Sequence, residues 1–158
     1  MAAKFIVGID LGGTNLRIAL LNLQYRILKK QVLGTRSFSS KDKLILAIRS
    51  SLTGILEASR LQRKDILGVG LGLPGPVDAK RGLVHFLPNI PGWREVNLKS
   101  ILQGRTGLPV FLDNDAKLMC LAEHRLGAAV GFRNVICISG YRRGFGYYHR
   151  KSALSRQG

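Results

Sequence analysis

Acidic residues are scarce in this 158-residue sequence. Nine Asp and Glu side chains stand against 25 Lys and Arg, which gives a formal net charge of +16 at pH 7. An excess of this size ordinarily favours a nucleic acid or an anionic surface as partner. The last eighteen residues contribute +5 of it, and no compact basic stripe interleaved with aromatics precedes residue 140. We therefore expect no nucleic-acid partner.

Cysteine and long apolar runs are also scarce. The two cysteines, Cys120 and Cys137, lack the close spacing of metal ligands, and we interpret them as buried thiols. No run approaches the ~20 apolar residues that a membrane span needs, so we expect no membrane partner. Residues 1–4 lead directly into an apolar run, which leaves no room for a signal peptide. These features predict a cytoplasmic protein whose length suffices for one domain.

The most informative feature that is present is a glycine turn after an acidic residue, Gly8-Ile9-Asp10-Leu11-Gly12-Gly13-Thr14-Asn15. The apolar runs on both sides indicate two strands, and a tight turn between them presents consecutive N–H groups to phosphate oxygens. Asp10 ends the first strand, where its carboxylate could organise a magnesium ion. An ordinary hairpin turn also explains the paired glycines. The Asp before the turn and the Thr after it favour phosphate binding.

The order of elements indicates an α/β fold. Apolar runs predict an antiparallel meander of three strands at about 4–10, 15–22 and 25–34. Apolar residues at helical spacing then predict a helix that ends near residue 60 and that Ser39 or Ser40 would cap. Further elements are expected at 67–73 (strand), 82–86 (extended), 98–103 (helix), 110–112 (strand), 116–126 (helix) and 134–138 (strand).

The segment Gly70-Leu71-Gly72-Leu73-Pro74-Gly75 fits the dinucleotide-binding pattern G-x-G-x-x-G. That motif requires a helix to begin at the glycines, whereas Pro74 and Pro76 favour a turn. We therefore reject a dinucleotide site here.

Four blocks occur in order over residues 4 to about 139: Asp10-Leu11-Gly12-Gly13-Thr14-Asn15, Gly70 to Asp78, Pro88-Asn89-Ile90-Pro91-Gly92-Trp93 and Asn114-Asp115-Ala116. They resemble, in the same order, the first phosphate motif, the central Gly-Pro-Gly segment, the sugar-contacting loop and the catalytic motif of the ROK family of bacterial sugar kinases and related repressors. Each block alone is a weak signal, but four in order are specific. The resemblance implies that residues 1–139 are the N-terminal lobe of an actin-like ATPase. Such a ribonuclease-H-like lobe has a three-stranded antiparallel meander followed by alternating helices and strands.

The resemblance also implies the roles of the site residues. Asp115 would be the general base that takes a proton from the sugar's primary hydroxyl as that oxygen attacks the γ-phosphate of ATP. A positioned base typically contributes about 10²–10⁴-fold to the rate. The implied sugar contacts are Gly75, Asn89, Asn114 and Asp115; the implied ATP phosphate contacts are Asp10, Gly12, Gly13 and Thr14, with Asp10 also near Mg²⁺ through water.

Structural roles compete with several of these assignments. Asp115 begins a predicted helix and could be its N-terminal cap. Asn89 and Gly75 each lie between prolines, where a turn residue is expected. We interpret Trp93 as a hydrophobic anchor for its loop rather than a platform for a sugar. Lys117 stands where many relatives have Asn, which weakens any choice of sugar.

The sequence changes character after Ile138, where the family would place a second phosphate loop, Gly-Thr-Gly-x-Gly. Codons can be chosen for Tyr141 onward so that the next reading frame encodes TGVGSGIIIGKALYRGR, which resembles the missing loop and its strand. We therefore interpret residues 140–158 as a frameshifted or disordered tail. A genuine basic, aromatic tail that binds nucleic acid by stacking is the alternative.

The resemblance predicts ATP-dependent phosphorylation of a glucose-like hexose at its primary hydroxyl. The alternatives are a sugar-responsive ROK repressor, which would carry a DNA-binding domain ahead of the first phosphate motif, and a non-catalytic basic lobe. Complete Asp10 and Asp115 motifs favour the kinase. The implied cofactors are ATP and Mg²⁺, with zinc only in a C-terminal lobe, and full-length relatives are expected to be homo-oligomers. We expect one lobe alone to be inactive.

Overall fold

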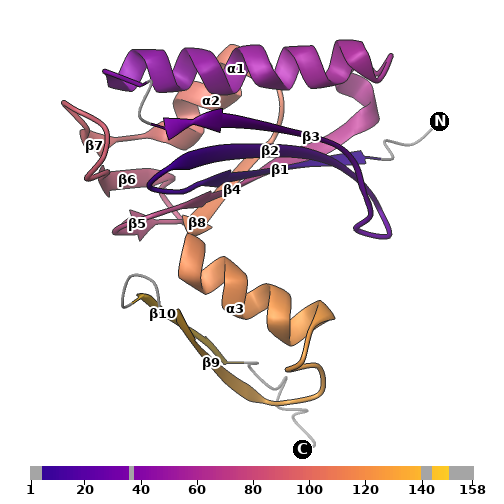
Figure 1. The fold of residues 1–158 in the computed structure, drawn as a ribbon, viewed down its shortest axis with the longest axis vertical. Helices are drawn as coiled ribbons and strands as arrows, with labels where there is room; N and C mark the ends of the chain where they lie inside the picture. Colours follow the sequence, from indigo (N-terminus) through magenta and orange to yellow (C-terminus); the bar gives the residue numbers. More distant parts are fainter. Residues whose placement is uncertain (1–4, 36–37, 140–143, 150–158) are drawn as a thin grey trace, which may run out of the picture. The chain divides into compact units, whose positions relative to one another are not determined.

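The computed structural model describes residues 5–35, 38–139 and 144–149. The chain forms two compact units, residues 1–114 and residues 115–158. Figure 1 colours the first unit from indigo to orange and the second from orange to yellow.

The first unit is built on a five-stranded sheet in the order β3-β2-β1-β4-β8 (Figure 1). The strands are β1 (Phe5–Leu11), β2 (Asn15–Asn22), β3 (Ile27–Gly34), β4 (Ile66–Leu73) and β8 (Val110–Asn114). β1, β2 and β3 pair antiparallel, while β1, β4 and β8 pair parallel. The predicted meander is therefore confirmed, with parallel strands added on the far side of β1.

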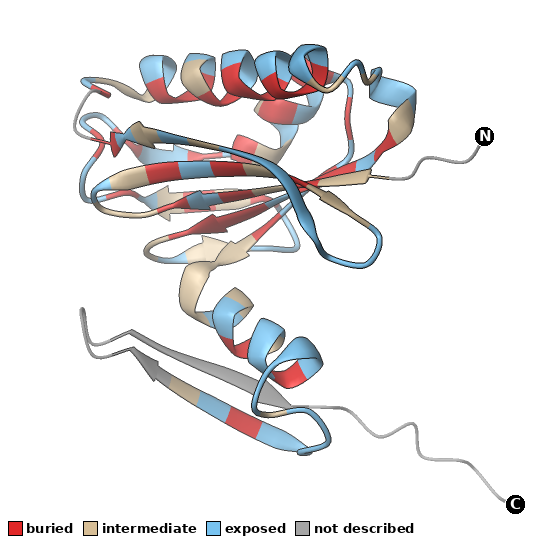
Figure 2. Cartoon of the chain, turned by 45° about the vertical axis from the view of Figure 1, so that its right-hand side comes forward, coloured by how far each residue is buried: buried red, intermediate tan, exposed pale blue. Residues whose placement is uncertain are grey.

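Two helices cover one face of this sheet, α1 (Lys41–Ala58) and α2 (Leu98–Thr106) (Figure 1). The hydroxyl of Ser40 accepts a hydrogen bond from the Lys43 backbone N–H, which confirms one of the two predicted caps. One face of α1 is buried, by Leu44, Ile45, Ile48, Leu52, Ile55 and Leu56 (Figure 2). Fully burying one such side chain contributes roughly 1.5–3 kcal/mol, so this face fixes the helix on the sheet.

A second, three-stranded antiparallel sheet follows β4. It consists of β5 (Val77–Asp78), β6 (Leu83–Phe86) and β7 (Arg94–Val96), of which only the middle strand was predicted. A short 3₁₀ helix at Arg63–Asp65 was also not predicted. β5, β7 and the 3₁₀ helix, which were not predicted, have two or three residues each, too few to show a period in the sequence.

The first two glycines of the rejected dinucleotide pattern lie inside a strand, and the third lies in the turn after it. Gly70 and Gly72 belong to β4, Pro74 and Gly75 form the turn after it, and β5 begins at Val77. No helix begins at these glycines, which confirms the rejection.

The second unit contains the helix α3 (Asp115–Leu126) and the strands β9 (Asn134–Ser139) and β10 (Gly144–His149), which pair antiparallel. The helix and β9 were predicted. β10 was not, because its residues fall in the segment interpreted as a tail; its aromatic residues suit a strand. The rest of that segment, residues 140–143 and 150–158, lies outside the described residues.

Within the described ranges of both units, no helix is both long and apolar enough to cross a membrane.

Candidate functional site

The carboxyl ends of the parallel strands bring two aspartates into one row of the sheet. Asp10 of β1 is the register partner of Gly72 in β4, and Gly72 is the partner of Asp113 in β8. Register partners share a face, and the alternating core residues of β1 and β8 are buried on the side of the helices. Both carboxylates therefore belong to the opposite face, on either side of a residue without a side chain.

An ion pair extends this row to β2. Arg17, the register partner of Asp10 on β2, places its Nη1 2.9 Å from Asp10 Oδ2. About half of each side chain is exposed, 48% for Arg17 and 51% for Asp10. Exposed pairs contribute roughly 0–1 kcal/mol to stability. The pair therefore orients the Asp10 carboxylate more than it stabilises the fold.

The glycine turn between β1 and β2 is held from the end of β3. Thr35 is almost completely buried, and its Oγ1 donates a hydrogen bond to the Gly12 carbonyl at 3.0 Å. Its backbone N–H donates to the Thr14 carbonyl at 2.7 Å, and the Gly12 N–H donates to the Asn15 carbonyl at 2.8 Å. Gly13 is half-buried and Thr14 is exposed. The turn is therefore fixed by its carbonyl groups while its outer surface stays open.

The turn after β4 is tied to the end of β8. Asn114 Nδ2 donates a hydrogen bond to the Gly75 carbonyl at 3.1 Å. Gly75 has φ +94°, and a Cβ there would lie 2.8 Å from the Phe86 carbonyl oxygen. Only glycine fits this position without strain. The backbone itself thus requires Gly75, whatever part the residue has in contacting a ligand.

The loop between β6 and β7 presents Asn89 outward. Leu87, Ile90 and Trp93 are buried at three-residue spacing, and backbone hydrogen bonds join Ile90 N–H to the Leu87 carbonyl and Trp93 N–H to the Ile90 carbonyl. Trp93 Nε1 donates to the Val84 carbonyl at 3.2 Å. This confirms Trp93 as an anchor. Asn89 is exposed between the anchors, so its side chain is available to a ligand.

Asp115 is the first residue of α3 and follows Asn114, the last residue of β8. Its Oδ1 accepts a hydrogen bond from the Ala116 backbone N–H at 2.8 Å. Two residues earlier in the chain, Asp113 Oδ1 accepts a hydrogen bond from the Asn114 N–H at 2.7 Å. Negative charge is favoured at a helix N-terminus, so the helix itself favours a carboxylate at this position.

Comparison with known proteins decides the family. The model of the ROK family matches residues 6–147. The chain belongs to the ROK family. The glucokinase of Thermotoga maritima is 37% identical over 134 residues, which are 85% of this chain and 41% of that protein. The xylose repressor of Caldicellulosiruptor bescii is 32% identical over 122 residues, 77% of this chain and 30% of that protein.

A solved structure confirms the fold. The ROK family glucokinase from Streptomyces griseus, in complex with glucose and AMPPNP, has a TM-score of 0.74 and 34% sequence identity. The match covers 90% of this chain and 43% of that one. The fold is the actin-like ATPase fold of ROK sugar kinases, as predicted, and the chain spans less than half the length of these relatives.

The carboxylate oxygens on the sheet face opposite the helices would fit a magnesium ion. Mg²⁺ keeps several waters and is bound by one or two carboxylates together with substrate phosphates. Asp10 and Asp113 are two such carboxylates. Among the residues that the structure describes, no three His, Cys, Asp or Glu side chains converge as a complete metal site. The donor set therefore suits an ion held partly by water and nucleotide.

Three residues that shape this candidate site were assigned no role from the sequence. Asp113 joins the row through strand register, Arg17 pairs with Asp10 across a hairpin, and Thr35 reaches the turn from β3. The Asp113-Asn114-Asp115 run did signal that Asp113 lies near the motif. Nothing in the local pattern signals Thr35.

Proposed function

We propose that this chain is the N-terminal lobe of a ROK kinase that transfers the γ-phosphate of ATP to the primary hydroxyl of a glucose-like hexose. The row of Asp10, Gly72 and Asp113, with Asn114 and Asp115 following directly in the chain, is the observation on which the proposal depends. The identity to glucokinases supports the choice of reaction.

One set of residues is proposed to bind the ATP phosphates and a second set to bind the sugar. The N–H groups of Gly13 and Thr14 bind the ATP phosphates, as consecutive backbone donors do, while the Gly12 N–H holds the turn by donating to the Asn15 carbonyl. Asp10 orients water around Mg²⁺, which neutralises charge on the phosphates. Phosphoryl transfer needs mainly positioning and charge stabilisation, and Thr35 keeps the turn in one conformation for both.

On the sugar side, Asp115 takes the proton of the primary hydroxyl as its oxygen attacks the γ-phosphorus. Asn89 and Asn114 read the orientation of the other hydroxyls, because an amide offers both a donor and an acceptor. The hydrogen bond from the Asn114 amide to the Gly75 carbonyl fixes the side chain of Asn114 beside the turn that is proposed to approach the sugar. Gly75 lets the backbone approach the sugar closely.

We also propose that residues 140–158 result from a shifted reading frame and that the 158-residue chain alone does not turn over. The chain spans 41% of the Thermotoga maritima glucokinase. A single lobe cannot close over its substrates, so it neither excludes water nor aligns the attacking oxygen.

The test of function uses the protein with its frame restored and its second lobe present. ATP-dependent production of sugar phosphate is measured with glucose, mannose and xylose, for this restored protein and, in parallel, for the 158-residue chain. The proposal expects turnover of a hexose by the restored protein only. Turnover by the 158-residue chain, or none by a folded restored protein that binds ATP, contradicts it.

A sugar-responsive repressor is the second candidate, because xylose repressors match at 32% identity. It predicts that the restored protein binds a sugar, and DNA in a sugar-dependent manner, without consuming ATP. The same sugar panel with a DNA-binding assay separates the two functions.

A further inference from the structure

Both cysteines of the chain lie in the second unit, Cys120 on α3 and Cys137 on β9. Cys120 is completely buried, and its Sγ donates a hydrogen bond to the Val135 carbonyl on β9 at 3.2 Å. Successive side chains of a strand alternate between its faces, so Cys137 shares a face with Val135. The buried thiol is thus directed at the face of β9 on which the other cysteine lies.

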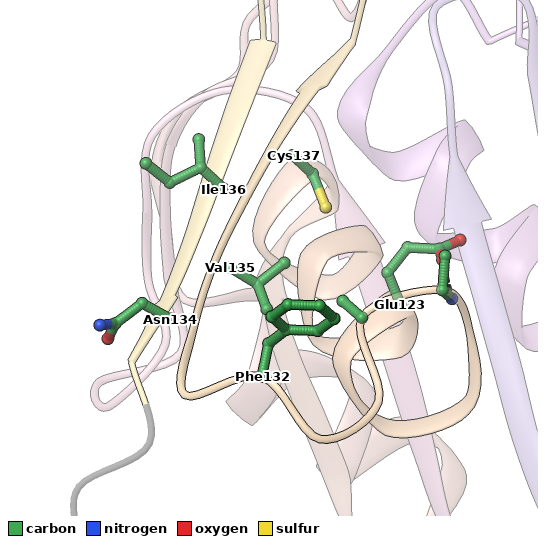
Figure 3. A pocket seen from close by; sticks show the side chains of 8 residues that line it. Glu123, Phe132, Asn134, Val135, Ile136 and Cys137 are labelled. Atoms are coloured by element: carbon green, nitrogen blue, oxygen red, sulfur yellow. Dashed lines mark hydrogen bonds between the residues drawn. The ribbon is translucent and has the colours of Figure 1, made fainter.

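Figure 3 shows the side chains of β9 in this region. Val135 and Cys137 point toward the side of Glu123, whereas Asn134 and Ile136 point away. Cys137 is half-buried and lines an open hollow of about 360 Å³, at the lower end of the range for small-molecule sites. A small reagent can therefore reach Cys137 but not Cys120.

The environment also makes Cys137 a reluctant nucleophile. Burial raises the pKa of its thiol, as do a hydrogen bond to the Cys120 side chain and the nearby charge of Glu123. The hydrogen bond of Cys120 to β9 and the orientation of the Cys137 side chain bring both thiols to the interface between α3 and β9. The raised pKa favours the protonated thiol of Cys137, and the thiolate is the reactive form, so attack by Cys137 is slow at neutral pH.

We propose that Cys120 and Cys137 are a thiol-oxidation site, which a low-molecular-weight disulfide converts into an intramolecular disulfide. The Cys137 thiolate attacks one sulfur of the oxidant, whose S–S bond breaks and releases one thiol. Cys120 then attacks the Cys137 sulfur of the mixed disulfide and releases the second thiol. The protein loses two electrons and two thiol protons, and the oxidant is reduced to two thiols.

A metal is a weaker occupant of this site. Two sulfurs are only half of a structural zinc set, and in the described part of the chain no third His, Cys, Asp or Glu converges with them. The disulfide would link α3, whose first residue is Asp115, to β9. It constrains the loop between residues 120 and 137, so it stabilises the oxidised unit.

The test equilibrates the full 158-residue chain with reduced and oxidised glutathione, blocks free thiols with N-ethylmaleimide and measures intact mass. The expected product is a monomer that lacks two hydrogen atoms and carries neither N-ethylmaleimide nor glutathione. Cys120→Ser is expected to stop at a glutathione adduct on Cys137. Cys137→Ser is expected to stay unmodified, because Cys120 is buried.

A second measurement compares the equilibrium constant for disulfide formation in native buffer and in urea, and it requires no variant. If the native fold aligns the sulfurs, the equilibrium constant for the disulfide is expected to be at least roughly tenfold higher in native buffer than in urea, because loop closure is already paid by folding. Equal constants, a stable glutathione adduct on the unaltered protein, or disulfide-linked dimers would each overturn the proposal.

Discussion

Asn114 reaches from the end of β8 to the turn after β4, where its side-chain amide donates a hydrogen bond to the Gly75 carbonyl at 3.1 Å. Leu73 and Asn114 are register partners in the two parallel strands. The contact therefore joins two segments that the sequence separates by 39 positions. It holds the Gly-Pro-Gly turn next to the residue that precedes Asp115.

The first prediction concerns the backbone of that turn. Gly75→Ala places a Cβ 2.8 Å from the Phe86 carbonyl oxygen at a residue with φ +94°, so both a clash and backbone strain are expected. The free energy of unfolding is expected to fall by about 1–3 kcal/mol, measured by urea denaturation.

Gly92→Ala is the matched control for Gly75→Ala. Gly92 has a similar φ of +72°, but a Cβ there meets nothing within 4 Å. It therefore isolates the strain of a positive φ from the clash with Phe86. Equal losses for the two variants would show that the close approach at Gly75 does not exist.

The second prediction concerns the support of the glycine turn. Thr35→Val keeps the shape of a buried side chain but removes the hydrogen bond to the Gly12 carbonyl. We expect a loss of about 1 kcal/mol in stability and weaker binding of Mg²⁺-ATP to the restored protein, measured by titration calorimetry. Thr106→Val, which removes a buried hydrogen bond to the Leu102 carbonyl far from the turn, should lower stability and leave nucleotide affinity unchanged. Loss of affinity in both variants would argue against a specific role for Thr35.

The third prediction concerns the pH dependence of Cys137. Because burial, the Cys120 thiol and Glu123 raise its pKa in the folded state, the neutral thiol is favoured by folding. This contribution to stability is present below the thiol pKa of the unfolded chain and is lost as the pH rises through the folded value. Alkylation of Cys137 by iodoacetamide should therefore be slower at neutral pH than in urea and should accelerate at alkaline pH.

A variant tests the causes of that shift. Cys120→Ser leaves most of the burial in place but alters the contact with the second thiol, so the midpoint of the pH–rate profile should move toward the ordinary value. An unchanged profile in Cys120→Ser would show that the two sulfurs do not interact.

The fourth prediction concerns the gene. A shift of one base near the codon for residue 140 implies that the next frame continues through a Gly-Thr-Gly-x-Gly loop and then a cluster of cysteines. Sequencing the genomic DNA from the codon for Ile138 to several hundred bases past Gly158 tests this. A next frame that closes at once would mean that the basic tail is genuine.

Much of the fold was predictable because its signals are local. The meander, α1, α2 and α3 each have enough residues to show a period, and Ser40 is an ordinary cap. β5 and β7 have two and three residues, and β10 lies in a segment whose composition resembles a tail. Short strands depend on partners elsewhere in the chain, so propensity alone does not find them.

The candidate site was predictable only where a motif lies in one stretch of sequence. Asp10, Asn89 and Asn114 follow from such motifs. The row from Asp10 to Asp113 depends instead on the register of three strands, and the Thr35 contact spans 23 positions. Such long-range relationships leave no periodic trace in the sequence, so they require the folded structure.

The central claim is that Asp115 is the base of a sugar kinase, and steady-state kinetics of Asp115→Asn in the restored protein tests it most directly. The amide cannot accept the hydroxyl proton, so kcat for glucose phosphorylation should fall by about 10²–10⁴-fold with KM for ATP nearly unchanged. Asp42→Asn, a change in the first turn of α1 on the covered side of the sheet, should retain activity. A restored enzyme in which Asp115→Asn turns over like the unaltered protein would contradict the account.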